Sequence, residues 1–310
     1  MQVLRRCAWV AVVALGVACG GTDGAAISTP PETGRDASAS ASDAGAPVDA
    51  SVEDEHDASP AAEAGVDAAP SGGTLRVMTY NIKVASESNL AAIAQVIRTE
   101  NPDLVGLEEV DELANRSGST HQTDVLSAAA GLPHRYFGAN FPFDGGFYGL
   151  AVLSRFPLTN PRVIRLDART TRGDGYEPRI AVAVDVVAYG KPVTFVAMHA
   201  SLHAEERPGN AQAVLTALGS ARRPAIVVGD MNETPGTAIG AAFTGAGFID
   251  AHAQKTGNPL EGLTSPASFP IKRIDFVYKD AAFGPTRYSW VPSTTASDHR
   301  PVMVTFDTPR

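Results

Sequence analysis

A short apolar run that ends in a group of polar residues constrains the fold of this chain most. Residues 226–228 are one isoleucine and two valines, and Gly-Asp-Met-Asn follows them directly. The run predicts a buried strand, and Asp230 and Asn232 point to the same side if the chain stays extended. Thr234 and Pro235 then predict the start of a helix. The segment therefore predicts a strand end that is open to a ligand, although the same residue types also form ordinary turns.

From residue 74 onwards the sequence mixes such strands with amphipathic helices. Predicted strands cover residues 75–80, 103–110, 149–154, 179–187, 193–199, 273–279 and 302–306. Predicted helices cover 90–100, 123–130, 205–218 and a segment that begins at 235. Asn89 is placed to cap the first helix, and the Gly- and Phe-rich residues 137–148 predict a loop. Because strands outnumber helices and include hairpins, the pattern predicts a mixed α+β sandwich rather than a purely parallel sheet.

The first 73 residues differ from the rest and predict no packed core. In residues 1–19, Arg5 and Arg6 precede an apolar run that is too short to span a bilayer, which predicts an export signal. The small residues before Cys19 resemble the lipobox of bacterial lipoproteins, so we expect Cys19 to be lipidated, with an ordinary cleaved signal as the alternative. Residues 20–73 repeat Asp-Ala among Ser, Pro and Gly, and we expect them to form a disordered acidic linker.

Charge and cysteine content separate this linker from the domain that follows it, residues 74–310. The linker holds 11 acidic residues and one basic residue, whereas the domain holds 23 acidic and 22 basic residues. The formal charge of −9 therefore comes mostly from the linker, and the domain lacks the basic excess typical of proteins that bind a phosphate backbone. Both cysteines lie in the first 19 residues, which excludes disulfides and thiolate metal sites within the domain.

Polar side chains gather at the ends of the predicted strands. They are Asn81, Glu109, His199, Asp230, Asn232, Asp275, Asp298 and His299. Together they offer oxygen ligands for a hard cation, amides and an imidazole for a phosphate, and a second imidazole with a carboxylate partner. Metal-assisted hydrolysis needs these groups, and oxygen ligands favour Mg²⁺ or Mn²⁺ over softer metals.

Seven short motifs, in a fixed order, resemble the endonuclease/exonuclease/phosphatase superfamily, which includes deoxyribonucleases, sphingomyelinases and inositol-polyphosphate 5-phosphatases. The motifs are Thr79-Tyr80-Asn81-Ile82, Leu107-Glu108-Glu109-Val110, Tyr148–Arg155, His199, Gly229-Asp230-Met231-Asn232, Arg273-Ile274-Asp275-Phe276 and Ser297–Val302. The resemblance covers residues 74–307. It implies a four-layer α/β/β/α sandwich of two mostly antiparallel mixed sheets, with the site at one edge of both sheets.

The resemblance also implies which residues hold the metal. Glu109 matches the principal metal-binding glutamate of the family, and Asn81 and Asp298 match residues on the metal side of the site. Glu108 stands where many relatives have glutamine. Strand alternation should turn Glu108 away from Glu109, so we expect that it is not a ligand.

A second group of residues matches the catalytic positions of the family. His299 matches the imidazole that activates or orients the attacking water, and Asp275 matches its carboxylate partner. Asp230 and Asn232 match the pair that positions the nucleophile and stabilises the developing charge. His199 matches a histidine that is hydrogen-bonded to the scissile phosphate.

Two further residues are candidates for contact with the substrate phosphate. Tyr148 matches a tyrosine or small residue near the phosphate, with packing as the alternative role. Arg179 could bind a phosphate bidentately, or could simply be a solvated residue at the start of a strand. Arg116 and Arg207 are weaker candidates.

The resemblance predicts a divalent-metal-dependent hydrolase of phosphoester bonds, most consistently a phosphodiesterase, in which water attacks directly. Nucleic acid, phospholipid or sphingomyelin, and small monoesters all remain open as substrates. Residues 139–147 are apolar and acidic, whereas four arginines within residues 162–172 could follow a phosphate backbone or form a solvated face. A catalytically silent binding domain displayed at the surface is the alternative from another class.

We expect an exported monomer without an obligate protein partner. If Cys19 is lipidated, the domain is tethered to a bacterial membrane, and the outer membrane is favoured because no acidic residue follows Cys19 directly. Otherwise we expect a periplasmic or secreted protein. The sequence leaves the number of metal ions open.

Overall fold

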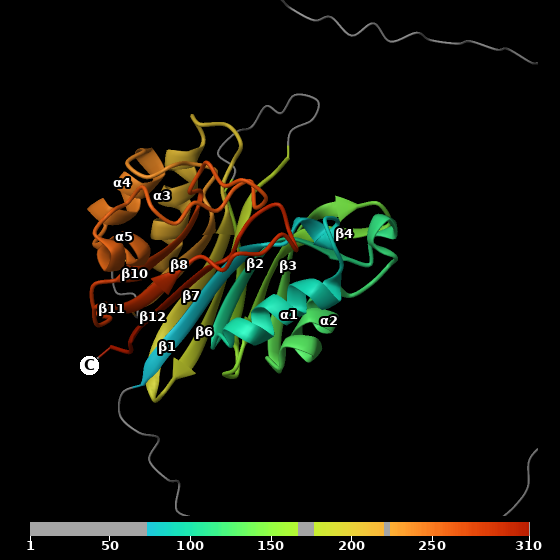
Figure 1. Ribbon diagram of the computed structural model, residues 1–310, viewed down its shortest axis with the longest axis horizontal. Helices are drawn as coiled ribbons and strands as arrows, with labels where there is room; N and C mark the ends of the chain where they lie inside the picture. The colour runs from blue at the N-terminus through green and yellow to red at the C-terminus, as the bar shows by residue number, and fades with distance from the viewer. Residues whose placement is uncertain (1–72, 167–176, 220–223, 310) are drawn as a thin grey trace, which may run out of the picture. The chain divides into compact units, whose positions relative to one another are not determined.

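Figure 1 shows the computed structural model, which describes residues 73–166, 177–219 and 224–309. The predicted signal and linker, with Cys19, lie outside these residues, as do Arg169 and Arg172. Their assignments therefore stay predictions. Within the described part of the chain, no helix is long and apolar enough to span a membrane.

Two six-stranded sheets form the centre of the domain. The first has the order β11-β12-β1-β2-β4-β3, with β1 (Thr74–Asn81), β2 (Leu104–Glu112), β3 (His134–Phe143), β4 (Gly146–Ser154), β11 (Thr286–Trp290) and β12 (Val302–Asp307). The second has the order β5-β6-β7-β8-β10-β9, with β5 (Thr159–Arg165), β6 (Ile180–Ala188), β7 (Lys191–His199), β8 (Ala225–Asp230), β9 (Phe248–Asp250) and β10 (Asp275–Asp280). β1 runs parallel to β2 and β7 parallel to β8, while the other neighbours are antiparallel.

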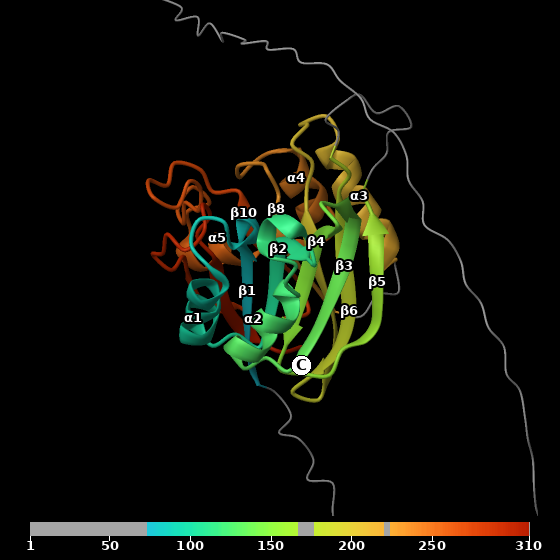
Figure 2. The ribbon, with the colours of Figure 1, turned by 90° about the vertical axis from the view of Figure 1, so that its right-hand side faces the viewer.

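Helices cover the outer faces of both sheets (Figures 1 and 2). α1 (Leu90–Glu100) and α2 (Gln122–Ala130) pack on the first sheet. α3 (Arg207–Leu218) and α4 (Ala238–Gly245) pack on the second, and α5 (Ala251–Thr256) contacts β10 and β11. Two short 3₁₀ turns, η1 (Lys83–Ala85) and η2 (Asn115–Ser117), follow β1 and β2. The predicted four-layer α/β/β/α sandwich is confirmed.

Three apolar clusters hold these layers together. One fills the space between the sheets and includes Val77, Val184, Phe195 and Val228. The other two lie between each sheet and its helices. Together the three clusters remove apolar area from water on both faces of each sheet. The domain therefore holds its core by packing.

Local sequence signals explain several element boundaries. The side chain of Asn89 accepts a hydrogen bond from the Ala92 amide at the start of α1, as predicted. Gly131 ends α2 in the left-handed conformation, with φ at 73°. These signals act within one or two turns of chain, which is why the sequence alone identifies them.

Two predictions about local structure are wrong. Residues 137–148 are not a loop, because β3 and β4 form a hairpin there that turns at Asp144 and Gly145, whose φ values are 47° and 82°. Asp-Gly is a strong hairpin signal, but the Gly- and Phe-rich composition around it was interpreted as a loop. α4 begins at Ala238 and not at 235. The Glu233 carboxylate accepts a hydrogen bond from the Ile239 amide, and so provides an acceptor for one of the main-chain N–H groups in the first turn of this helix. The sequence analysis also missed β5, β9, β11 and α5.

Candidate active site

The candidate site lies where the apolar core between the sheets ends. Every second residue of β1, β7, β8 and β10 faces the opposite sheet, as Val77, Ala197, Val228 and Val277 do. Continued toward one edge, these four rows reach Asn81, His199, Asp230 and Asp275, all of them buried. The alternation that builds the core therefore also aims four polar side chains into one small volume.

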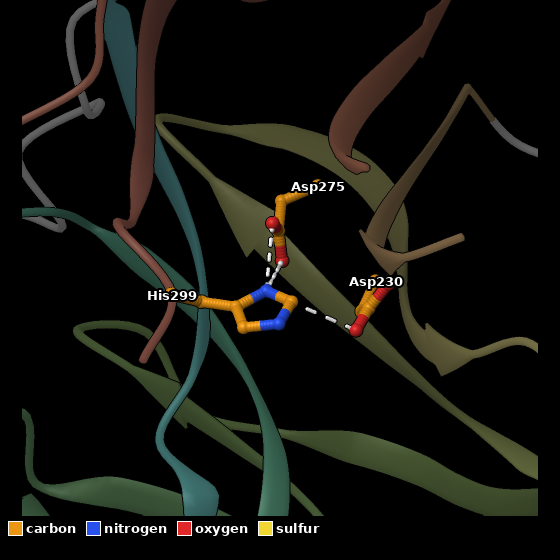
Figure 3. Close-up of side chains that lie close together, drawn as sticks. All are labelled: Asp230, Asp275 and His299. Atoms are coloured by element: carbon orange, nitrogen blue, oxygen red, sulfur yellow. Dashed lines mark hydrogen bonds and ion pairs between the residues drawn. The ribbon is translucent and has the colours of Figure 1, made fainter. Parts of the chain in front are cut away.

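His299, Asp275 and Asp230 form the centre of this group (Figure 3). Nδ1 of His299 donates to Asp275, at 2.9 Å from Oδ2 and 3.2 Å from Oδ1. Oδ2 of Asp230 lies 3.9 Å from the same nitrogen. Because Asp275 holds Nδ1, the other ring nitrogen of His299 is the one left for a substrate or water.

Burial and charge shift the pKa values of this trio. Burial alone would lower the pKa of His299, but the charge of Asp275 and its hydrogen bond, followed by the charge of Asp230, raise it to about 10. Burial and then the charge of Asp275 raise the pKa of Asp230 to about 7. At neutral pH the imidazole is therefore protonated, and Asp230 is close to its own titration point.

The three side chains also resemble a metal site, since one ligand atom from each lies within 4.8 Å of the others. An imidazolium ion, however, has no lone pair to give to a metal. With Nδ1 of His299 bound to Asp275, the trio fits proton transfer better than cation binding. The oxygen groups that suit a cation lie on the other side of Asn81, at Glu109.

Asn81 links this trio to the predicted metal side. Its Nδ2 donates to Oε1 of Glu109 at 2.9 Å and to Oδ2 of Asp230 at 3.2 Å. The hydroxyl of Ser297 donates to the main-chain oxygen of Asn81 at 2.8 Å, which fixes the loop that carries His299 against the end of β1. One amide thus spans both halves of the site.

A β-bulge places the two glutamates of β2, and the expected alternation is wrong there. The register of β2 against β4 shifts between Leu107 and Val110, and Glu109 has a φ of 57°. Glu108 accepts a hydrogen bond from the Thr79 hydroxyl at 3.0 Å, while Glu109 binds Asn81. Since residues 79 and 81 share one face of β1, both glutamates turn to the same side.

The oxygen groups on the metal side fit a hard divalent cation. Burial raises the pKa of Glu109, the hydrogen bond from Asn81 opposes this, and the charge of Asp298 raises it further. Two carboxylates that repel each other in this way gain from a shared cation. Lys83 supplies one positive charge already, with its Nζ 3.1 Å from Oδ2 of Asp298.

His199 and Arg179 form the phosphate side of the site. Nη1 of Arg179 lies 2.9 Å from Nδ1 and 3.2 Å from Nε2 of His199, and 3.0 Å from Oε1 of Glu177. Nε2 of His199 is also 3.5 Å from Oδ2 of Asp230. Burial, then the charges of Arg179 and His299, hold the pKa of His199 well below its usual range, so the ring is neutral.

Asn232 is close to the site, but its side chain turns elsewhere. Its φ is 50°, so the chain is not extended after Asp230 as the sequence had suggested. The main-chain amide of Asn232 donates to Oδ1 of Asp230 at 2.8 Å, and its Nδ2 donates to the oxygen of Ala200 at 3.0 Å. In this structure Asn232 therefore orients Asp230 through its backbone.

The weaker arginine candidates have structural partners. Arg162 lies 3.6 Å from Asp185, Arg165 donates to the main chain of Asn140, and Arg207 donates to the main-chain oxygen of Ser201. Arg116 is bound by Asp111 and lines a cavity beside Glu109, together with Tyr148. Tyr148 therefore lies at the edge of the site, where it lines the same cavity as Glu109.

Sequence reasoning missed Lys83 and the burial of Glu108 at the site. Lys83 gave no signal, because nothing in the residues around it predicts the left-handed turn that brings it to Asp298. Consecutive glutamates at a strand end were a signal for Glu108, but only the bulge turns both inward.

Comparisons with known proteins show the family to which this chain is similar. The model of the endonuclease/exonuclease/phosphatase family matches residues 78–299. The chain is similar to a solved endonuclease/exonuclease/phosphatase structure from Beutenbergia cavernae, at 28% identity and a TM-score of 0.62, over 75% of this chain and 71% of that one. No curated protein sequence matches.

More distant structures share the fold. A mannosyl-6-phosphatase from Bacteroides thetaiotaomicron is 19% identical with a TM-score of 0.59, over 75% of this chain and 99% of that one. A humanised TDP2 from D. rerio is 18% identical with a TM-score of 0.57, over 76% and 99%. Since the family model spans most of the domain and the two-sheet architecture agrees, this chain belongs to the endonuclease/exonuclease/phosphatase family of metal-dependent phosphoester hydrolases.

Proposed function

We propose that this protein is a magnesium-dependent phosphodiesterase in which water attacks the phosphorus directly. The observation that carries the proposal is the continuous hydrogen-bonded chain from Glu109 through Asn81 to Asp230, with the His299–Asp275 pair beside it. Each member of this chain is a group that phosphoester hydrolysis needs.

Asp230 is the group suited to take the proton from water. Its pKa of about 7 lies near the working pH, where a general base combines a useful ionised fraction with adequate basicity. His299 is protonated and held by Asp275, so it offers an N–H to the oxygen atoms that gain charge. The two residues therefore divide the work, with Asp230 as base and His299 as the source of positive charge.

The phosphate would lie between His199 and the metal side. His199 is neutral and Arg179 is fixed against it, so both can donate hydrogen bonds to phosphate oxygens. Glu109 would hold Mg²⁺, with Asn81 and Asp298 next to it. When bound, the cation supplies Lewis-acid stabilisation of charge on the phosphate and on the leaving oxygen.

The test is hydrolysis by the whole protein in Mg²⁺, in Mn²⁺ and in chelator. The panel contains plasmid DNA, RNA, sphingomyelin, phosphatidylinositol, mannose 6-phosphate and a chromogenic diester. We expect metal-dependent cleavage of at least one diester, and a loss of about 10²–10⁴-fold in His299→Ala.

A matched control separates the site from general damage. His134→Ala removes a partly exposed imidazole at the start of β3, which pairs with the end of β4 that lies away from Glu109. This variant should keep full activity. If no member of the panel is cleaved although the protein is folded, and Mg²⁺ does not raise its melting temperature, the silent binding domain becomes the better interpretation.

A further inference from the structure

A large cavity opens beside Glu109, and its volume is in the range of sites that bind organic ligands. It measures about 920 Å³. Binding sites for organic ligands span about 300–1,000 Å³, so this cavity has room for far more than a phosphate group. Its walls come from the turn after β1, from η2 and from the β3–β4 hairpin. A substrate whose phosphate lies at Glu109 therefore has one organic group within reach of this space.

One wall of the cavity is a rigid aromatic platform. The rings of Phe141 and Tyr148 are 5.4 Å apart, and those of Phe141 and Phe143 are 6.1 Å apart and nearly perpendicular. The Arg116 guanidinium lies 4.3 Å from the centre of the Phe143 ring. Both of its hydrogen bonds to the buried Asp111 measure 2.8 Å, so the planar cation is fixed in place. This wall offers flat surfaces on which a ring can stack.

A strained turn forms another part of the cavity wall. Lys83, Val84 and Ala85 have φ values of 44°, 49° and 59°, a conformation that non-glycine residues rarely adopt even singly. The buried Gln122 holds the turn, because its Nε2 donates to the main-chain oxygen of Val84 at 2.9 Å. Strain of this kind costs about 1–3 kcal/mol per residue and tends to occur at ligand clamps. The hydrogen bond from Gln122 therefore holds this part of the cavity wall in place.

Charges in the cavity favour an uncharged ligand group. The charge of Arg116 is offset by Asp111, and that of Lys83 by Asp298 and Glu87. Glu109 and Glu177, which also line the cavity, are both acidic, and Glu177 is paired with Arg179. A second phosphate would therefore meet no cation without a carboxylate partner in these walls, whereas an aromatic ring would meet apolar and planar surfaces.

We propose that this cavity binds an uncharged aromatic ring carried by one ester arm of the substrate, stacked against Phe143 and Arg116. The proposal rests on the proposed function, since it assumes that the phosphate lies at Glu109. Such a ring could be a nucleobase or an aryl group, and both share the chemistry of a flat π surface. Stacking of a base on an aromatic side chain is worth about 1–3 kcal/mol, which is about 5- to 150-fold in affinity.

The test compares ligands that differ only in aromaticity. Titration calorimetry of the full chain in Mg²⁺ measures binding of benzyl methylphosphonate, cyclohexylmethyl methylphosphonate and the methylphosphonate ester of thymidine. We expect the benzyl compound to bind at least fivefold more tightly than the cyclohexylmethyl compound. The thymidine compound distinguishes the two sources of the ring, because it binds at least as tightly as the benzyl compound if the natural ring is a nucleobase.

Matched variants locate the effect. Phe143→Leu keeps apolar bulk but removes the ring, and it should abolish the benzyl preference. Phe147→Ala removes an aromatic side chain of similar exposure, 45% against 38%, that lies on the same hairpin outside this cavity, and it should keep the preference. Equal binding of the two compounds by the wild type, or an unchanged preference in Phe143→Leu, would overturn the inference.

A parallel hydrolysis assay keeps the two proposals separate. It uses benzyl methyl phosphate and cyclohexylmethyl methyl phosphate under the same conditions, with ³¹P NMR as the readout. A benzyl preference in binding without turnover of either ester would refute the proposed function and leave the cavity assignment standing. Turnover of both esters with no preference in binding or rate would do the reverse.

Discussion

Replacing Glu108 by glutamine should stabilise the metal-free protein, and more so as pH rises. The side chain of Glu108 is fully buried, with 0% exposure. Oε1 accepts a hydrogen bond from the Thr79 hydroxyl, but Oε2 has no hydrogen-bond partner in the described part of the chain. Burial and then the charge of Asp275 raise the pKa of Glu108 well above its usual value. The folded protein therefore keeps this carboxyl group protonated under conditions in which the unfolded chain releases the proton.

The size of the effect follows from proton linkage. The stabilisation by this proton is complete below the unfolded glutamate pKa of about 4.3, and it is lost as pH rises toward the raised pKa of the folded state. Each pH unit in that interval costs the wild type about 1.4 kcal/mol relative to Glu108→Gln, which has no proton to lose. One kcal/mol moves the melting temperature of a domain of this size by about 2–4 °C. The two melting temperatures should therefore separate by about 3–6 °C per pH unit.

The assay is thermal unfolding from pH 5 to pH 7 in chelator, so that no metal ion contributes. Glu261→Gln makes the same chemical change at an exposed position and is the control for the loss of a carboxylate. The reasoning is refuted if the gap between wild type and Glu108→Gln is constant over this range. It is also refuted if the wild type gains stability relative to the variant as pH rises.

Two further predictions test the metal side and the cavity wall. Mg²⁺ at about 100 times its Kd should stabilise the protein by about 2.7 kcal/mol in thermal unfolding, and Glu109→Gln should remove this stabilisation. If Mg²⁺ stabilises the variant as much as the wild type, Glu109 is excluded as the ligand. Arg116→Ala should cost about 3 kcal/mol in urea unfolding, because it leaves the buried Asp111 carboxylate without its partner. Adding Asp111→Asn should restore most of that loss, and an unrescued loss would contradict the account of the pair.

The sequence predicted the parts of the site that depend on short stretches of chain. Alternation within β8 and β10 aims Asp230 and Asp275 at the opposite sheet, and that alternation is readable residue by residue. The pairing of His299 with Asp275 came from the family resemblance, and the structure brings the two side chains into contact. The prediction failed where tertiary contacts override the local pattern, as at Asn232, whose side chain turns to Ala200.

The cavity shows most clearly what a sequence pattern leaves out. Its aromatic wall lies on a hairpin that the composition had suggested was a loop. Another part of the wall is a left-handed turn that Gln122, at the start of α2, holds through Val84. Apart from Tyr148, the side chains of these walls belong to no motif, because their placement depends on partners distant in sequence.

The acidity of the site connects its stability to its function. Glu108, Glu109, Asp230 and Asp275 approach one another at the end of the inter-sheet core, and each raised pKa among them is partly the repulsion of a neighbouring carboxylate. That repulsion destabilises the metal-free fold and favours any bound cation, since both effects arise from the same uncompensated charge. A glutamine at position 108 would relieve part of it without touching Asn81 or His299. The glutamate in this chain therefore makes the metal-free protein less stable as pH rises, and a bound cation that favours its ionised form should couple metal binding to the release of its proton.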